Sequence, residues 1–249
     1  MAWNLDVGMA PCRADRSFLP GPMISQTIVP RIRPVALIGL AALAACSDPS
    51  TVDLAVAEGG TVTLPVRVHI LSSQRFPQLD ARIDEDEVSA LVVEANQVWA
   101  AAEIRWDVTE VLFEEAVETD GFQQMLEQVA QGQDVDADVL RGVLPRENRV
   151  PGEWDAFFIH DLGESPVAGV YFGAGLLVVK VASQFESPNL ALTGRVLAHE
   201  LGHSLSLPHV PCVSRGNLMA VGCLGEDRRR LEGSQIAAAR RQSVRRVPY

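Results

Sequence analysis

The chain has 249 residues, 47% of them hydrophobic, and its formal net charge is −11. This size and composition suit one globular domain with an appendage. Residues 1–46 hold four Arg and two Asp, so the remainder carries 17 basic and 30 acidic groups, a net charge of −13. A body this acidic argues against nucleic acid as a partner.

The first 46 residues have the features of an export signal. Arg31 and Arg33 precede an apolar run over 35–45, which has the length of a signal h-region and is too short to span a bilayer. The run ends in "LAAC", which resembles the lipobox of bacterial lipoproteins. The resemblance implies that Cys46 is lipidated and becomes the first mature residue. A plain secretory signal is the alternative, and in either case Met23 would make a more typical start.

Residues 47–60, "SDPSTVDLAVAEGG", are small and polar and predict a flexible tether ahead of a domain over 61–249. We therefore expect an extracytoplasmic protein, anchored by lipid to a bacterial membrane on its periplasmic face or at the cell surface. In that oxidising compartment Cys212 and Cys223 are expected to form a disulfide. Zinc binding by this pair is the weaker alternative, because no further cysteine completes a site.

Hydrophobic patterning predicts strands and helices in alternation after residue 60. "TVTLPVRVHIL" (61–71) alternates and predicts a strand, with Pro65 near a sheet edge or a strand start. Asp84 and Glu87 have the spacing of a capping box, and apolar residues then recur at helical spacing to about 102. Further along we expect a strand over 104–113, helices over 121–131 and 136–144, a buried strand over 154–162 and a bulged hairpin or edge strand over 167–181. The pattern predicts an α+β domain in which a sheet packs on helices.

Three features of this region favour a structural role. His69 lies within the first predicted strand and His160 at the end of a buried one, so neither is expected to bind a metal. The acidic stretch "DVDAD" (134–138) lacks the glycine and the distal glutamate of an EF-hand loop. We therefore do not expect calcium there.

The stretch "LTGRVLAHELGHSLSL" (192–207) predicts one helix that carries two histidines on one face. His199 and His203 are four residues apart, so they differ by ~40° around the axis and ~6 Å along it, and both rings can reach one cation. A catalytic zinc commonly has three protein ligands plus water. Glu200 is the base that the H-E-x-x-H arrangement requires. Histidines that only serve the core are the alternative.

His209 can join this pair only if the helix ends and the chain turns back. In a continuous helix His209 would lie ~9 Å beyond His203 and point away from it. Pro208 disfavours helical geometry at the preceding residue and supplies the stop. A left-handed residue at such an end is usually glycine, whereas this chain has Ser206, at a cost of order 1 kcal/mol. Three metal bonds would offset that cost.

The stretch 199–209, together with Met219 in "GNLMA" (216–220), resembles the metzincin clan of zinc metallopeptidases. The clan's pattern is H-E-x-x-H-x-x-G-x-x-H followed by a methionine turn, and Ser206 departs from it. The resemblance implies a small, twisted, mostly parallel sheet, a last helix near 231–241, and one catalytic Zn²⁺. It assigns the zinc ligands as His199, His203 and His209, the general base as Glu200, and the apolar floor beneath the metal as Met219. A gluzincin-like site with Glu226 as third ligand is the alternative.

The same resemblance implies hydrolysis of peptide bonds in a protein or peptide substrate. The substrate would pair with a sheet edge, for which 169–175 is the candidate. The region before residue 61 has no cysteine-switch pattern, so a protein inhibitor is a possible partner. The alternative function is a cell-surface lipoprotein with a structural zinc site that binds a partner without cleaving it. Glu200 favours the enzyme, because a structural site has no need of that base.

Overall fold

The computed structural model of the chain describes residues 60–181, 189–213, 216–221 and 228–245. These residues belong to one compact unit. The predicted signal region with Cys46, the predicted tether up to residue 59, Cys223 and Glu226 lie outside the described residues. Within the part searched, no helix is both long and apolar enough to cross a membrane.

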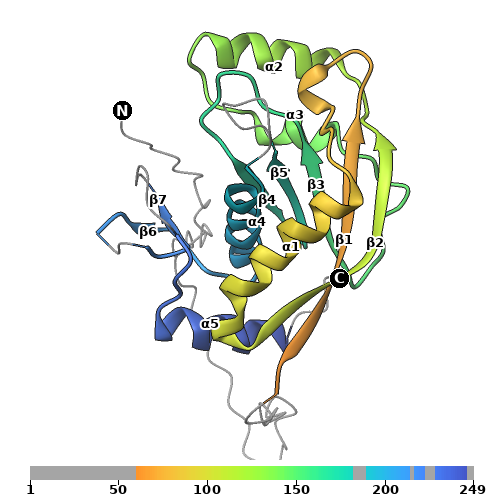
Figure 1. Cartoon of the computed structure of the whole chain (residues 1–249). Helices are drawn as coiled ribbons and strands as arrows, with labels where there is room; N and C mark the ends of the chain where they lie inside the picture. Colours follow the sequence, from red (N-terminus) through yellow and green to blue (C-terminus); the bar gives the residue numbers. More distant parts are fainter. Residues whose placement is uncertain (1–59, 182–188, 214–215, 222–227, 246–249) are drawn as a thin grey trace, which may run out of the picture. The chain divides into compact units, whose positions relative to one another are not determined.

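A five-stranded sheet with strand order β2-β1-β3-β5-β4 lies at the centre of this unit (Figure 1). The strands are β1 (Val62–Ser72), β2 (Ile104–Glu115), β3 (Trp154–Ile159), β4 (Gly169–Gly173) and β5 (Leu176–Lys180). Strands β2, β1, β3 and β5 run parallel to one another, and β4 at the edge pairs with β5 in antiparallel fashion. The predicted mostly parallel sheet is therefore confirmed, and the segment 167–181 forms the predicted hairpin.

Pro65 lies in an inner strand and not at a sheet edge. β1 pairs with β2 along its whole length, whereas its pairing with β3 begins only at Val66. Pro65 therefore precedes the part of β1 that is paired on both sides, where a missing N–H would cost a ladder hydrogen bond. Of the two predicted positions, the strand start is the one observed.

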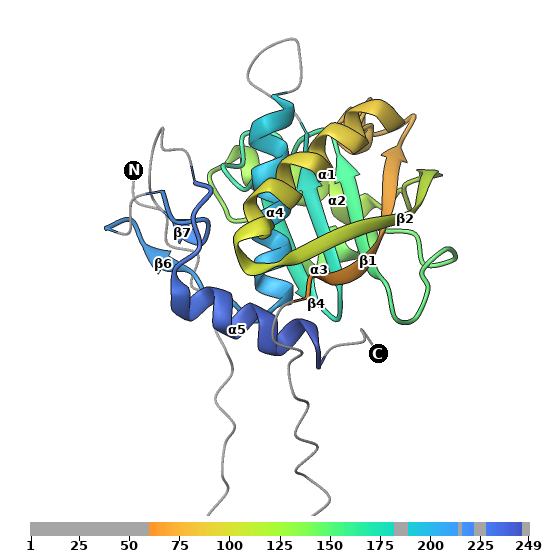
Figure 2. The same ribbon diagram turned by 60° about the horizontal axis from the view of Figure 1, so that its bottom comes forward.

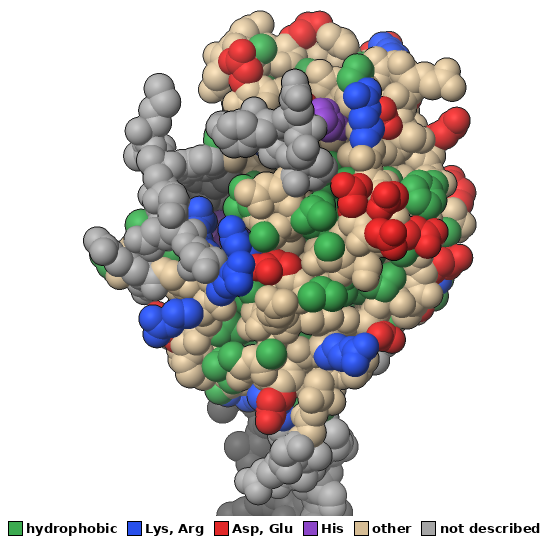
Figure 3. Space-filling view, in the orientation of Figure 1, with side chains coloured by type: hydrophobic (Ala, Val, Ile, Leu, Met, Phe, Trp, Pro, Cys, Tyr) green, Lys and Arg blue, Asp and Glu red, His purple; other side chains and the backbone are tan. Residues whose placement is uncertain are grey.

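Helices cover both faces of the sheet. α1 (Glu85–Trp99) and α4 (Leu190–Ser204) pack on one face, and α2 (Asp120–Ala130) and α3 (Ala137–Gly142) on the other (Figures 1 and 2). The short 3-10 turns are η1 (Pro77–Leu79) and η2 (Ala100–Ala102). Towards the C-terminus follow the two-stranded sheet of β6 (Val210–Pro211) and β7 (Ala220–Val221), and helix α5 (Gly233–Ser243). Acidic side chains gather on the face shown in Figure 3, in keeping with the net charge.

The predicted capping box starts α1. The Asp84 side chain accepts a hydrogen bond from the backbone N–H of Glu87 at 2.9 Å, and the Glu87 carboxylate accepts one from the backbone N–H of Asp84 at 3.0 Å. Both bonds satisfy N–H groups that have no partner inside the helix. Asp136 has a similar role at the start of α3, where it accepts from the N–H groups of Asp138 and Val139. The acidic stretch 134–138 thus serves a helix cap.

Two tryptophans tie α4 to the rest of the core. The indole N–H of Trp99 in α1 donates to the Ala198 carbonyl at 3.2 Å, and that of Trp154 in β3 donates to the Ser204 hydroxyl at 3.0 Å. Trp106 packs edge-on against both rings, at centroid distances of 6.4 and 5.2 Å. The two hydrogen bonds lie on either side of residues 199–203 in the sequence, so they fix the segment of α4 that carries two of the candidate ligands.

Helices α1 and α4 approach closely at Gly194. A Cβ atom at this position would lie 2.7 Å from the Cβ of Glu94 and 2.8 Å from the backbone oxygen of Leu91. Real side chains do not reach such distances, and the Leu91 oxygen is held in the backbone of α1. Glycine at 194 is therefore a packing requirement of this helix pair.

We expect Gly194→Ala to lower the free energy of unfolding by about 1–3 kcal/mol, because the added methyl group forces the two helices apart. Gly142→Ala is the matched control. A Cβ atom there would have nothing within 4 Å, so this variant should be neutral or stabilised by up to about 1 kcal/mol. Urea unfolding of both variants measures the difference, and equal stabilities would contradict the packing argument.

Candidate metal centre

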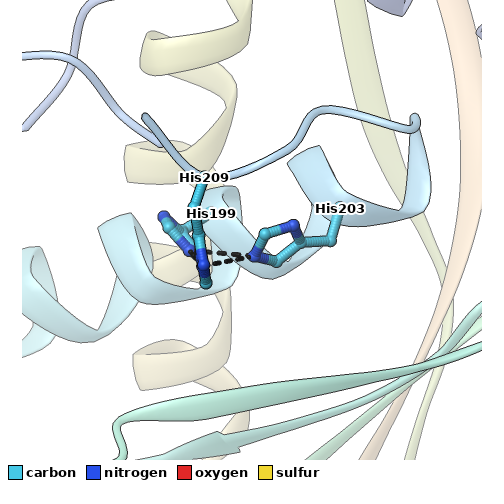
Figure 4. Close-up of side chains that lie close together, drawn as sticks. All are labelled: His199, His203 and His209. Atoms are coloured by element: carbon cyan, nitrogen blue, oxygen red, sulfur yellow. Dashed lines mark hydrogen bonds between the residues drawn. The ribbon is translucent and has the colours of Figure 1, made fainter. Parts of the chain in front are cut away.

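His199, His203 and His209 converge on one point (Figure 4). The Nε2 atom of His199 lies 3.1 Å from that of His203 and 3.1 Å from that of His209, and the last two are 2.9 Å apart. In a tetrahedral site with zinc–nitrogen distances of about 2.0–2.1 Å, ligand nitrogens are separated by ~3.3 Å. The three nitrogens are thus within a few tenths of an ångström of the spacing that a shared zinc ion requires.

The other ring nitrogens show why a cation suits this arrangement. His199 Nδ1 lies 2.8 Å from the Leu218 carbonyl oxygen, and His203 Nδ1 lies 2.9 Å from that of Leu207. A carbonyl oxygen only accepts, so both Nδ1 atoms carry a proton, and in the neutral rings both Nε2 atoms carry a lone pair. Two facing lone pairs repel each other, whereas a cation between them binds both. Backbone carbonyls commonly orient metal-binding histidines in this way.

Burial keeps the three histidines in the form that binds a metal. Burial, together with the neighbouring imidazoles, which act in the same direction, lowers the pKa of His199 to about 3 and that of His203 to about 4. Burial also lowers the pKa of His209. The rings are therefore neutral near pH 7, and a neutral imidazole is the species that donates its lone pair to a metal ion.

A tight turn at the end of α4 brings His209 back to the other two rings. Ser206 has a φ of +64°, in the left-handed region. The backbone N–H of Ser206 donates to the carbonyl of His203 at 2.9 Å, and that of Leu207 donates to the carbonyl of Gly202 at 3.0 Å. These two bonds define a Schellman motif. The turn expected from Pro208 is therefore present, with a serine in the position that glycine usually occupies.

Met219 packs beneath the helix that carries the histidines. Its side chain is fully buried, and a Cβ atom at Gly202 would lie 2.6 Å from the Met219 sulfur. Gly202 is the residue before His203, so the methionine reaches the helix backbone directly under the metal-binding segment. Its role as the apolar floor beneath a metal ion stays a prediction.

Glu200 lies between α4 and the edge strand β4. Its side chain is buried, and a Cβ atom at Gly169 in β4 would lie 2.8 Å from its Oε1. No hydrogen bond or ion pair in the described part of the chain reaches its carboxyl group, and burial raises its pKa to about 8. The sequence singled out 169–175 as an edge, but nothing in it indicated that Gly169 makes room for Glu200.

The remaining histidines lie apart from this group. His69 is buried in β1, where its Nε2 is 3.1 Å from Asp155, its Nδ1 contacts Glu114, and its ring stacks on Phe157. His160 follows β3 and lies 3.6 Å from the carboxylate of Asp161. The buried and partnered ring of His69 fits the structural role expected for it, whereas the His160 side chain is 37% exposed. The predicted disulfide involves Cys223, which lies outside the described residues, so the pairing with Cys212 stays a prediction.

No protein-family model matches the chain, and no curated protein matches it in sequence. Among solved structures, archaemetzincin from Methanopyrus kandleri is similar over 74% of this chain and 97% of its own, at 19% identity and a TM-score of 0.49. Mature mirolysin from Tannerella forsythia, in complex with a cleaved peptide, is similar over 68% of this chain and 70% of its own, at 12% identity and a TM-score of 0.40. At these identities and scores, any function has to rest on the side chains described above.

We expect the full chain to bind one zinc ion, and His203→Ala to weaken that binding by more than about 100-fold, because it removes one of three ligands. His160→Ala is the matched control, since that ring lies outside the group, and it should bind zinc like the unchanged chain. Competition with a chromophoric chelator measures the affinity. Equal affinities for the two variants would show that zinc binds elsewhere.

Proposed function

We propose that the chain is a zinc-dependent endopeptidase in which His199, His203 and His209 hold one Zn²⁺ and Glu200 is the general base. The observation that supports this most directly is the convergence of three Nε2 atoms beside a buried glutamate. A structural zinc site is normally closed by a fourth protein ligand. Among the described residues no fourth His, Cys, Asp or Glu joins the group. Three ligands are the usual number for a catalytic site, which keeps a position for water or substrate.

The proposed reaction is hydrolysis of a peptide bond by water. A zinc ion held there would polarise the scissile carbonyl and make water a better nucleophile at neutral pH. The positive charge of a zinc ion held nearby would favour the ionised form of Glu200 over the neutral form that burial favours. The carboxylate would then take the proton from the attacking water and pass it to the leaving amine nitrogen. Among the described residues none hydrogen-bonds or ion-pairs with the Glu200 carboxyl group, so a water molecule bound at the metal would not compete with a protein donor for its oxygens.

A peptide substrate is supported by the edge strand next to Glu200. β4 is half-buried along its length and, among the described strands, pairs only with β5. Its other edge can pair with an extended peptide through backbone hydrogen bonds. Such pairing would run a peptide past Gly169, where the Glu200 carboxyl group lies. We therefore infer an extended stretch of protein or peptide as the substrate class.

The proposal includes the location expected from the sequence. The pattern over 43–46 supports lipidation at Cys46, and the tether would hold the domain outside the cytoplasm at a bacterial membrane. An oxidising location would also favour the Cys212–Cys223 disulfide.

Glu200→Gln should lower the rate of peptide cleavage by about 10²–10⁴-fold and leave the zinc affinity unchanged, because the amide keeps the shape of the side chain and loses its basicity. A library of quenched-fluorescent peptides detects cleavage, and chelator competition measures zinc. Glu164→Gln, at an exposed glutamate, is the matched control. If the Glu200 variant cleaves as fast as the unchanged chain, Glu200 is not the general base. If the unchanged chain binds zinc but cleaves no peptide, the structural-zinc alternative is the better description.

Gly169→Ala should lower kcat by about 10-fold or more, because the added methyl group overlaps the Glu200 carboxyl group and displaces it from the water. The three atoms nearest to such a methyl group all belong to Glu200 and none to a histidine, so zinc affinity should stay the same. Gly142→Ala provides the control on α3, where a Cβ atom meets nothing. Unchanged kcat in the Gly169 variant would mean that Glu200 does not need its present position.

A further inference from the structure

Helix α5 contacts both chain segments that orient candidate ligands. Gln235 near its start and Gln242 near its end are seven residues apart, which places them within about 20° of each other on one face of the helix. Each amide is hydrogen-bonded to a residue close to a histidine of the site. The two glutamines therefore connect one helix to two ligands. In Figures 1 and 2, α5 lies on the side of the domain where the chain leaves the C-terminal end of α4.

Gln235 acts on the segment that orients His199. Its amide and that of Asn217 exchange two hydrogen bonds, at 2.8 and 3.2 Å, and both side chains are buried. The Asn217 oxygen also accepts from the backbone N–H of Met219 at 2.8 Å. Leu218, between these two residues, supplies the carbonyl that accepts from His199 Nδ1. The amide pair thus fixes the backbone on both sides of the group that orients a ligand ring.

Gln242 acts on the turn that returns His209. Its Nε2 donates to the hydroxyl of Ser206 at 3.0 Å. Ser206 is the left-handed residue of the turn, and a serine occupies that conformation less readily than a glycine does. Within the described part of the chain, the Gln242 side chain makes one hydrogen bond, and its partner is Ser206. It favours the turn conformation in which His209 meets the other two rings.

The helix itself is held against the body of the domain. Arg240, between the two glutamines, donates to the carbonyl oxygen of Ala102 at 3.0 Å and to that of Gly60 at 3.3 Å, and it also pairs with Glu103. α5 therefore has a fixed place from which its glutamines can act on the two ligand segments.

We propose that Gln235 and Gln242 are positioning residues for the metal centre, the first through His199 and the second through His209. The inference rests on the proposed zinc site and adds that α5 prepares two of its three ligands before the metal arrives. If the ligands adopt the binding arrangement for only a fraction of the time, the apparent metal affinity equals the intrinsic affinity multiplied by that fraction. Loss of either glutamine should therefore weaken zinc binding without removing a ligand.

The test is the zinc affinity of the metal-free full chain, measured by chelator competition. We expect Gln235→Ala to weaken zinc binding by about 10–100-fold, the usual effect of losing a partner that orients a metal ligand. Gln242→Ala should weaken it by about 2–5-fold, because its hydrogen bond is exposed. Gln124→Ala, which removes an exposed glutamine from α2, is the matched control and should change nothing.

Combination with Ser206→Gly distinguishes positioning from a general loosening of α5. Glycine adopts a positive φ without a partner, so Gln242→Ala should have no effect on zinc affinity in the Ser206→Gly background. The same 2–5-fold loss in both backgrounds, or no loss in either, would overturn the role of Gln242. Because Gln242 lies near the surface, this arm stays informative even if Gln235→Ala fails to fold. Failure of the unchanged chain to bind zinc would instead remove the metal centre on which the proposal rests.

Discussion

The reversal of the chain after α4 is the constraint on which the candidate site depends. Three imidazole nitrogens about 3 Å apart come from residues 199, 203 and 209, and a helix can bring together only the first two. The third arrives because the helix ends at Ser204 and the next residues close a Schellman motif with Ser206 at positive φ. Any change that lets the helix continue past Ser204 would separate the rings, whatever the rest of the fold did.

The packing around α4 holds the two helical ligands in fixed positions, so that the reversed chain can bring the third ligand to them. The Trp99 and Trp154 indoles hold α4 on either side of the two helical ligands, and Gly194 and Gly202 let α1 and Met219 approach the helix backbone. A metal site gains affinity when its ligands need not be ordered on binding. Here the ordering is supplied by buried indole hydrogen bonds and close backbone packing, and these serve the fold even when no metal is bound.

Features encoded locally could be predicted, and those that join distant segments could not. The capping box at Asp84, the spacing of His199 and His203, and the helix stop before Pro208 each depend on residues within one or two turns. Gly169 beside Glu200 and Gln235 beside Asn217 depend on how a strand and a helix pack in space. A single glutamine or glycine has no spacing pattern that could indicate such a partner, so the residues that support the site were missed although the candidate ligands were identified.

The backbone strain at Ser206 is offset by a hydrogen bond from a residue that is distant in the sequence. A glycine in its place would remove a strain of order 1 kcal/mol, but it would also remove the hydroxyl that accepts from Gln242. The net contribution of one hydrogen bond is about 0.5–1.5 kcal/mol, of the same size as the strain. Serine at the turn and glutamine on α5 therefore compensate each other, and the turn need not be weaker than one built with glycine. The difference is that its stability now depends on the last described helix of the chain, 36 residues away in the sequence.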